Sequence, residues 1–364
     1  MATKVLVVDD TIFYRKVLKD LLESMPDIEV VGTANNGKVA MSRIKAFKPD
    51  LLTLDVEMPE MNGLEVLQEI QKQGYDVECL MVSSLTPKGG EITIQALSLG
   101  ALDFIAKPDA ATAEENTALL KKALEPKLRA FHRRRELKNL LKGRPVSGKS
   151  TVSKQDLTDV DSVLAKTKAA TVRTEKSKAI AIGVSTGGPN ALNKVIPLLQ
   201  PTLHVPVFVV QHMPKTFTAS LAQVLDKNSP LEVKEGQNGE IVRPNVVYIA
   251  PGGQQMKVAS AAQGKLIVRV TDDPPENNCK PSVDYLFRSI AREYGSKATA
   301  VIMTGMGSDG KLGVKVMKSA GAVTIAQNAA TCVVYGMPKA IIDAGMADVI
   351  APLDRIAGEI LKTV

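Results

Sequence analysis

Three side chains whose types suit acyl transfer follow three separate apolar runs in the second half of the sequence. Ser185 follows AIAIGV and precedes two glycines, His212 follows VPVFVVQ, and Asp309 lies in the turn after TAVIMTG. A serine hydroxyl attacks a carbonyl when an imidazole takes its proton, and a carboxylate orients that imidazole. The set predicts hydrolysis of an ester or an amide, with Asp309 accepting the Nδ1 proton of His212 and Nε2 facing Ser185.

Few other residues could fill these roles. The other histidines are His132, in a basic stretch, and His204, at the opening of an apolar run, so His212 is the candidate base. The rival acids are Asp272, Asp273 and Asp284. They follow less regular segments, and Asp309 is therefore preferred to them as the orienting acid.

The glycines of TGMGSDG also match a dinucleotide-binding loop, which would need an acid about 20 residues further along to hold a ribose. No Asp or Glu stands between Asp309 and Asp343. The simpler interpretation is that Gly305, Gly307 and Gly310 permit a tight turn whose backbone N–H groups can bind a developing oxyanion.

A second group of polar side chains follows apolar runs near the start of the chain. Asp9 and Asp10 close VLVV, Asp55 closes LLTL, Ser83 follows LMV, and Lys107 follows DFIA. The carboxyl ends of parallel strands meet at one edge of a sheet, so these groups are expected to lie together. Three carboxylates suit Mg²⁺, and with a hydroxyl and an ammonium beside them they predict a phosphoryl group carried on one carboxylate.

The elements that must position both groups alternate between short β-branched runs and amphipathic stretches. This pattern predicts an α/β protein: a five-stranded, doubly wound parallel domain over 1–125, a basic helix and flexible linker over 126–177, and a second doubly wound α/β domain over 178–364 with a mixed, mostly parallel sheet. Pro126 is expected to kink or divide the last helix of the first domain. Strands between 231 and 271 follow Gly and Pro turns without a helix, which predicts antiparallel pairing.

The distribution of charge along the chain bears on whether the protein binds nucleic acid. Residues 127–178 hold 15 Lys and Arg against 5 Asp and Glu, a net charge of +10, so the total of +7 leaves −3 for the remainder. This stretch has one aromatic residue, Phe131, and neither a pattern of aromatic residues interleaved with its charges nor a recognition helix, so it does not predict nucleic-acid binding. The absence of a long apolar run predicts a cytoplasmic protein.

Two further features of the sequence carry no predicted chemistry. Cys79, Cys279 and Cys332 are expected to be buried thiols. The P-loop match at 143–150 lacks the flanking strand and helix that a phosphate site needs.

The first domain resembles a response-regulator receiver domain, on VLVVDD, LLTLDVEMP, MVSS and FIAKP. The resemblance implies a flavodoxin-like fold and phosphoryl transfer from a chemotaxis histidine kinase to Asp55. It implies that Mg²⁺ is held by Asp9, Asp10, Asp55 and the backbone carbonyl of Glu57. It also implies that Ser83 and Phe104 form the switch pair and that Lys107 contacts the phosphoryl group.

The second domain, over residues 178–361, resembles the CheB family of chemotaxis protein-glutamate methylesterases, on GVSTGGPNAL, VVQHMP and TGMGSDG. The resemblance implies that Ser185, His212 and Asp309 are catalytic, and that Thr186 and Met306 line the site, with the Met306 N–H as an oxyanion donor. It implies that the protein demethylates glutamyl methyl esters of chemoreceptors, releasing methanol, and in some members deamidates glutamines.

The same resemblance implies that phosphorylation of the receiver domain relieves its inhibition of the esterase, that the esterase site needs no metal, and that the protein reaches membrane arrays only through receptors. The sequence alone leaves three other functions open. They are a receiver with an output module that lacks esterase activity, a transcriptional regulator, and a dehydrogenase.

Overall fold

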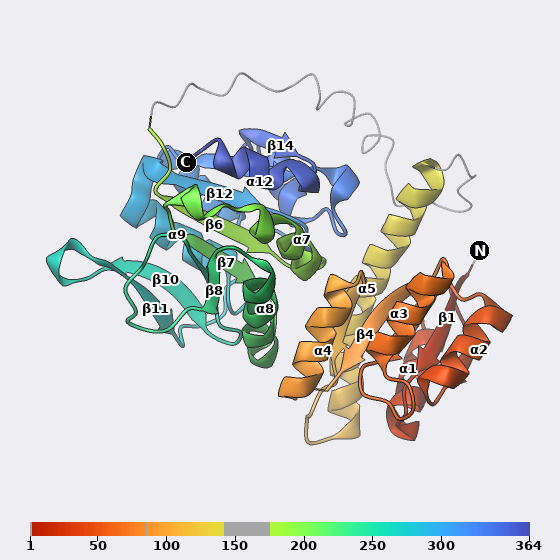
Figure 1. Cartoon of the computed structure of the whole chain (residues 1–364). Coiled ribbons are helices and arrows are strands. Elements are labelled where there is room, and N and C mark those ends of the chain that lie inside the picture. Colours follow the sequence, from red (N-terminus) through yellow and green to blue (C-terminus); the bar gives the residue numbers. More distant parts are fainter. Residues whose placement is uncertain (1, 85, 142–174) are drawn as a thin grey trace. The chain divides into compact units, whose positions relative to one another are not determined.

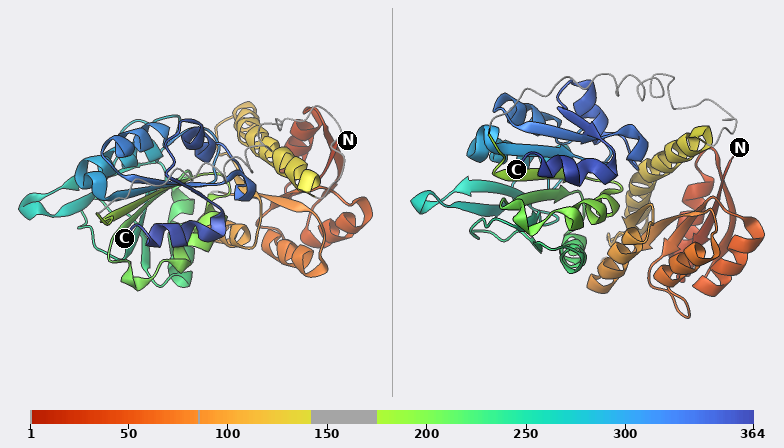
Figure 2. Two further views of the ribbon diagram at one scale, coloured as in Figure 1. Left: turned by 90° about the horizontal axis from the view of Figure 1, so that it is seen from above. Right: turned by 45° about the horizontal axis from the view of Figure 1, so that its top comes forward.

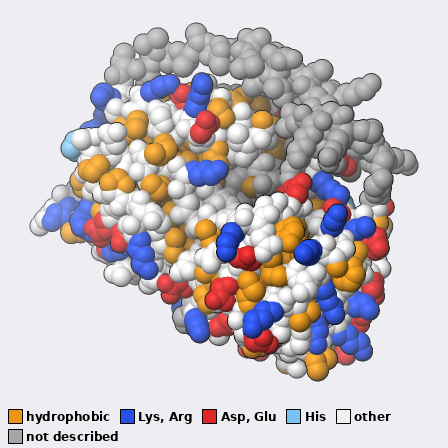
Figure 3. Space-filling model, turned by 45° about the vertical axis from the view of Figure 1, so that its right-hand side comes forward, with side chains coloured by type: hydrophobic (Ala, Val, Ile, Leu, Met, Phe, Trp, Pro, Cys, Tyr) orange, Lys and Arg blue, Asp and Glu red, His pale blue; other side chains and the backbone are white. Residues whose placement is uncertain are grey.

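The computed structural model describes residues 2–84, 86–141 and 175–364. The chain forms two compact units, one before and one after residues 142–174. The basic linker and the P-loop match at 143–150 lie largely or wholly outside the described residues. None of the described helices is long and apolar enough to cross a membrane. On the face in Figure 3, acidic and basic side chains of the described residues are interspersed.

The first unit is a parallel sheet in the order β2-β1-β3-β4-β5. Its strands are β1 (Thr3–Val8), β2 (Ile28–Ala34), β3 (Leu51–Asp55), β4 (Glu78–Ser83) and β5 (Asp103–Ala106). Its helices are α1 (Ile12–Glu23), α2 (Gly37–Phe47), α3 (Gly63–Gln73), α4 (Pro87–Ser98) and α5 (Ala113–Leu141). Helix α1 packs beside α5, and α2, α3 and α4 pack in a row, so helices cover both faces (Figure 1). The predicted doubly wound fold is confirmed, and its strand order switches between β1 and β3.

The sequence predicts that Pro126 kinks or divides the last helix of the first domain, but α5 is continuous across it, so the proline does not divide the helix. The helix continues to Leu141 and so crosses residue 125, where the sequence predicts the end of the domain. Beyond the proline, Phe131 is buried, Lys127 Nζ lies 2.7 Å from the Asp103 carboxylate, and Arg135 lies 2.6 Å from that of Asp50. These contacts offset the backbone hydrogen bond that proline removes.

The second unit is built on a seven-stranded sheet in the order β14-β13-β12-β6-β7-β9-β8. Its strands are β6 (Ala179–Val184), β7 (Val207–Gln211), β8 (Glu232–Glu235), β9 (Val246–Ile249), β12 (Ala298–Ile302), β13 (Val323–Gln327) and β14 (Val349–Ala351). Its α-helices are α7 (Gly188–Val195), α8 (Lys215–Asn228), α9 (Val283–Tyr294), α10 (Lys311–Ser319), α11 (Met337–Asp343) and α12 (Leu353–Leu361). Helices α8, α7 and α12 pack in one row and α9, α10 and α11 in another (Figure 2). This arrangement buries the sheet on both faces, which explains its nearly continuous apolar strands.

The prediction of antiparallel strands between 231 and 271 is correct only in part. Strands β10 (Gln255–Ser260) and β11 (Leu266–Thr271) form an antiparallel ribbon that projects from this unit (Figure 1). Strands β8 and β9 instead pair parallel, as does every other pair in the main sheet. The connection between β8 and β9, residues 236–245, contains no helix. It is held instead by backbone hydrogen bonds to β11, such as the one from the N–H of Gly239 to the carbonyl of Val268 at 2.8 Å.

Candidate active site

Ser185 stands in the turn between β6 and α7, at the carboxyl edge of the sheet. Its N–H donates to the Thr304 carbonyl at 3.0 Å, and its carbonyl accepts from the Gly188 N–H at 2.7 Å. Gly187 has a φ of 75°, and a Cβ on Gly188 would collide with the Gln211 side chain. The two glycines therefore permit a turn that larger residues would strain. The turn leaves the Ser185 side chain half-buried.

A second glycine-containing loop, after β12, lies against Ser185. A Cβ on Gly305 would lie 2.8 Å from that of Ser185, and Gly307 and Gly310 have φ values of 83° and 95°. The N–H of Met306 makes no hydrogen bond to another described residue. A free N–H beside a nucleophile is the type of donor that stabilises an oxyanion.

Thr186, the other predicted lining residue, is half-buried next to the nucleophile. Its carbonyl accepts a hydrogen bond from the Thr304 hydroxyl at 2.9 Å, and that hydroxyl also receives the Val334 N–H at 3.0 Å. Thr304, in the loop after β12, therefore joins the Ser185 turn to the segment around Val334, which follows β13.

Asp309 contacts the His212 ring, with 2.7 Å between Oδ2 and Nε2. The carboxylate is buried and accepts further hydrogen bonds from the Ser282 hydroxyl, the Asn277 side-chain amide, and the backbone N–H groups of Val283, Asp284 and Gly310. Helix α9 begins at Val283, so its N-terminus points at the carboxylate, where a negative charge is favoured. These bonds fix the acid in place, and the acid in turn fixes the ring.

Burial opposes the ionisation of both partners, and their contact overcomes it. Burial raises the pKa of Asp309, but hydrogen bonds from His212 and from the N-terminus of α9 hold that pKa at about 2. Burial lowers the pKa of His212, but Asp309 and Cys279 raise it to about 9. The site therefore stabilises the imidazolium that forms when His212 takes a proton.

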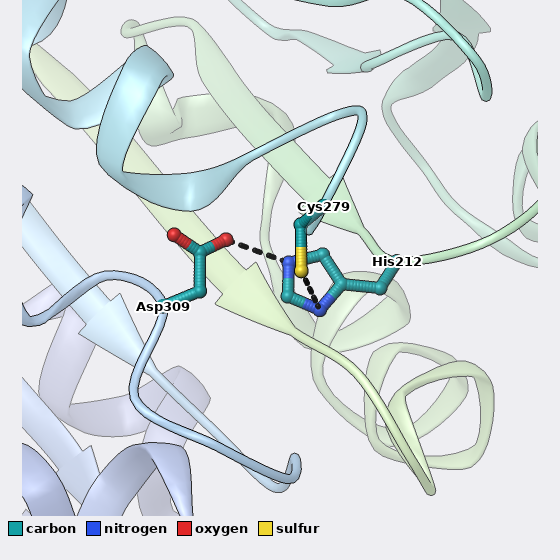
Figure 4. A group of neighbouring side chains, drawn as sticks. All are labelled: His212, Cys279 and Asp309. Atoms are coloured by element: carbon teal, nitrogen blue, oxygen red, sulfur yellow. Dashed lines mark hydrogen bonds and ion pairs between the residues drawn. The ribbon is translucent and has the colours of Figure 1, made fainter. Parts of the chain in front are cut away.

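The orientation of the ring is opposite to the prediction. Nε2 faces Asp309, and Nδ1 faces the thiol of Cys279, with 3.7 Å between Nδ1 and Sγ (Figure 4). Asp309 reaches the far end of the ring because α9 holds it there, which leaves Nδ1 as the nitrogen available for proton transfer.

The prediction that all three cysteines are buried thiols fails for Cys279. It is half-buried beside the base, as is Cys332 elsewhere, and only Cys79 is fully buried.

Ser185 and His212 are neighbours across two parallel strands. Val184 pairs with Gln211, so the two residues that follow occupy adjacent positions, and the His212 N–H donates to the Val184 carbonyl at 3.2 Å. Among the described residues, no hydrogen bond joins the Ser185 hydroxyl to the ring. Catalytic hydrogen bonds often tighten only when substrate binds. The arrangement thus places the nucleophile beside the base without their bond being formed.

In the first unit, the predicted acids gather at the carboxyl edge of the sheet. Carboxylate oxygens of Asp9, Asp10 and Asp55 lie within 4.8 Å of one another. Lys107 Nζ lies 2.7 Å from Asp55 and 2.9 Å from Asp9. Burial and the charge of Asp9 raise the pKa of Asp55 to about 7, against the opposing effect of Lys107. One ammonium therefore does not neutralise this cluster, and an oxygen donor set of this kind fits Mg²⁺.

The remaining residues predicted for this unit lie around that cluster. Ser83 is fully buried at the end of β4, and its hydroxyl donates to the Ser84 carbonyl at 3.2 Å. Phe104 is buried on the neighbouring strand, where it pairs with Met81. The Glu57 carboxylate accepts from the Ser84 hydroxyl at 2.8 Å, which leaves its backbone carbonyl as the predicted metal ligand.

Comparison with known proteins identifies the families of both domains. Residues 180–360 match the family described as CheB methylesterase, and residues 5–118 match the response regulator receiver domain. The Desulfotalea psychrophila protein-glutamate methylesterase/protein-glutamine glutaminase is 45% identical, over 99% of this chain and 98% of its own length. The Bacillus subtilis protein of the same name is 44% identical, over 99% and 98%. This chain belongs to the CheB family.

A solved structure agrees with the second unit of this CheB-family chain. The Thermotoga maritima CheB methylesterase catalytic domain is 43% identical and has a TM-score of 0.51, covering 52% of this chain and all of that domain. The predicted combination of a receiver domain with a methylesterase domain is therefore confirmed.

Sequence reasoning named Asp284 as a rival acid and Cys279 as a thiol, but missed that the 272–282 segment and the start of α9 surround the triad of this CheB-family chain. The contacting residues are Cys279, which faces the base, and Asn277, Ser282 and Asp284, which surround the acid. The one signal in the sequence is SVDYLF, in which a serine followed by an amphipathic run marks a helix N-terminus. That signal marks an anion-binding helix end but does not say which carboxylate it receives.

Proposed function

We propose that this chain hydrolyses glutamyl methyl esters of chemoreceptors and releases methanol, with Ser185 as nucleophile, His212 as base and Asp309 as orienting acid. The observation that supports this most directly is the 2.7 Å contact between His212 and Asp309 beside Ser185. The three residues follow the adjacent strands β12, β6 and β7. Methanol release from methylated receptor membranes tests the proposal, and an output module without esterase activity would release none.

In the proposed reaction, the Ser185 hydroxyl attacks the glutamyl carbonyl while Nδ1 of His212 takes its proton. The oxyanion accepts a hydrogen bond from the Met306 N–H, beside Thr186. The imidazolium then protonates the departing methoxide, which leaves an ester on Ser185. Water attacks this ester, His212 takes a proton from the water, and Oγ of Ser185 recovers a proton as the glutamate leaves. Substrate binding brings Ser185, in place of Cys279, onto Nδ1.

The same groups could cleave a glutamine side-chain amide, with ammonia in place of methanol, because the acyl intermediate is identical. The two relatives described above carry both activities in their names. We therefore infer that receptor glutamines are a second substrate, which ammonia release would test.

For the first unit we propose that a chemotaxis histidine kinase transfers a phosphoryl group to Asp55. Mg²⁺ held by Asp9, Asp10, Asp55 and the Glu57 carbonyl would offset the negative charge of the phosphoryl group. Lys107 already lies 2.7 Å from Asp55 and would contact that group, while Ser83 and Phe104 would respond to it. Boundaries at about 125 and 178, a cytoplasmic location and independence from nucleic acid stay predictions.

An Asp55→Asn variant is expected to lose stimulation by phosphodonor, because an amide cannot accept the phosphoryl group. Its basal esterase rate is expected to persist, since Asp55 belongs to the other unit. Methanol release with and without a small-molecule phosphodonor and Mg²⁺ measures both rates. Stimulation that survives in this variant would place the phosphorylation site elsewhere.

The esterase rate is expected to rise with pH well above the usual titration range of histidine. Only the neutral ring takes a proton from Ser185, and the pKa of His212 is raised from 6.5 to about 9. The neutral fraction therefore increases as pH rises through that raised value, and activity is lost as pH falls below it. A pH profile of kcat/KM checks this, and an acid limb at or below pH 6.5 would contradict it.

A further inference from the structure

The proposed reaction uses the ring of His212 as base but gives no role to the thiol of Cys279, which faces that ring. Nδ1 and Sγ are 3.7 Å apart, and Nε2 is held by Asp309 on the opposite side of the ring (Figure 4). The three ligand types, imidazole, thiol and carboxylate, lie within 4.8 Å of one another. The His212 side chain is 14% exposed and Cys279 is half-buried, so an ion in solution can reach them.

The separation matches two ligands of one tetrahedral zinc ion. Zinc binds sulfur at about 2.3 Å and imidazole nitrogen at about 2.0–2.1 Å, which places the two atoms about 3.6 Å apart at a tetrahedral angle. A carboxylate on the second ring nitrogen, as Asp309 is here, orients such a histidine and increases its basicity. Imidazole and thiolate together select zinc over magnesium, which prefers oxygen.

We propose that His212 Nδ1 and Cys279 Sγ form an inhibitory site for a soft divalent cation such as Zn²⁺. Binding requires two protons to leave for solvent, one from the Cys279 thiol and one from Nδ1 of the His212 imidazolium, whose ring keeps the proton on Nε2 against Asp309. The ion then occupies the nitrogen that would take the proton of Ser185. Water or the Ser185 hydroxyl completes the coordination, so the ion blocks the base and is not a cofactor.

Binding itself is tested without reference to esterase activity, using Co²⁺ as a spectroscopic probe for Zn²⁺. The full-length protein is expected to show near-ultraviolet thiolate-to-cobalt absorption that Zn²⁺ abolishes. A Cys279→Ser variant should lose this absorption, and a Cys332→Ser variant should keep it, because Cys332 is also half-buried but lies outside the pair. The absence of the absorption in the wild type, or its persistence in Cys279→Ser, would overturn the proposal.

The inhibitory consequence rests on the proposed esterase function and is measured separately, as methanol release at increasing Zn²⁺, relative to each variant's own zinc-free rate. Cys279→Ser is expected to need about 10- to 100-fold more Zn²⁺, since even the loss of an outer partner weakens metal sites by that factor. Mg²⁺ at the same concentrations should not inhibit, and a chelator should restore the rate. Equal zinc sensitivity in the wild type and Cys279→Ser would refute inhibition through this pair. A protein that binds cobalt through Cys279 but releases no methanol would contradict the proposed function alone.

Discussion

A Ser185→Ala variant is expected to lose at least about 10³-fold in kcat for methanol release, because no other group in the proposed reaction attacks the carbonyl. Binding of methylated receptor should change little, since only the small Oγ is removed. The measurement is methanol release from methylated receptor membranes, with receptor binding determined in parallel. A loss confined to KM would mean that Ser185 positions substrate and does not react with it.

The matched comparison for this variant is Cys279→Ala, because the Cys279 thiol is the group that faces Nδ1 of His212 in the structure. If Ser185 is the nucleophile, removal of Cys279 should change turnover by far less than the roughly 10²–10⁴-fold that general acid–base catalysis contributes, because the base itself remains. It should also move the acid limb of the pH profile to lower pH, since Cys279 helps to raise the pKa of His212. The reverse order of effects would identify a cysteine hydrolase.

An Asp309→Asn variant is expected to lose about 10⁴-fold in kcat, the effect of replacing the orienting acid in other triads. The amide cannot stabilise the imidazolium, and it brings two donors into a place where every neighbour already donates. The acid limb of the pH profile should also move to lower pH, because Asp309 raises the pKa of His212. Kinetics across the pH range measure both effects.

Asp272→Asn is the control for this variant. Asp272 is one of the rival acids and lies at the start of the 272–282 segment. Its carboxylate is 2.5 Å from Lys280 Nζ, and its side chain is 89% exposed. Its replacement should leave both the rate and the pH profile close to those of the wild type. A folded Asp309→Asn protein with an unmoved acid limb would mean that Asp309 serves only the stability of α9.

Residues at strand ends could be predicted from the sequence because parallel strands share one carboxyl edge. Asp9, Asp55 and Lys107 meet at such an edge in one unit, and Ser185 and His212 are adjacent at the edge of the other. Each assignment needs only the strand pattern and the polar residue that follows it. The parallel pairing of β8 and β9 was not predictable by this logic, because their connection contains no helix.

The orientation of the His212 ring could not be predicted because it depends on contacts from an irregular segment. Asn277, Cys279 and Ser282 precede α9 without regular periodicity, and they determine where Asp309 is held and what Nδ1 faces. A side chain's rotamer follows from such packing and not from its own spacing in the sequence. The sequence can therefore predict the roles of the three triad residues without predicting which ring nitrogen of His212 contacts Asp309.

The central claim is that the acyl group passes through Ser185, with Nδ1 of His212 as base. The most direct test is to stop turnover of a methylated receptor peptide with acid and to locate the covalent intermediate by mass spectrometry. The account predicts a glutamyl ester on Ser185 that resists neutral hydroxylamine. A hydroxylamine-sensitive thioester on Cys279 would contradict it.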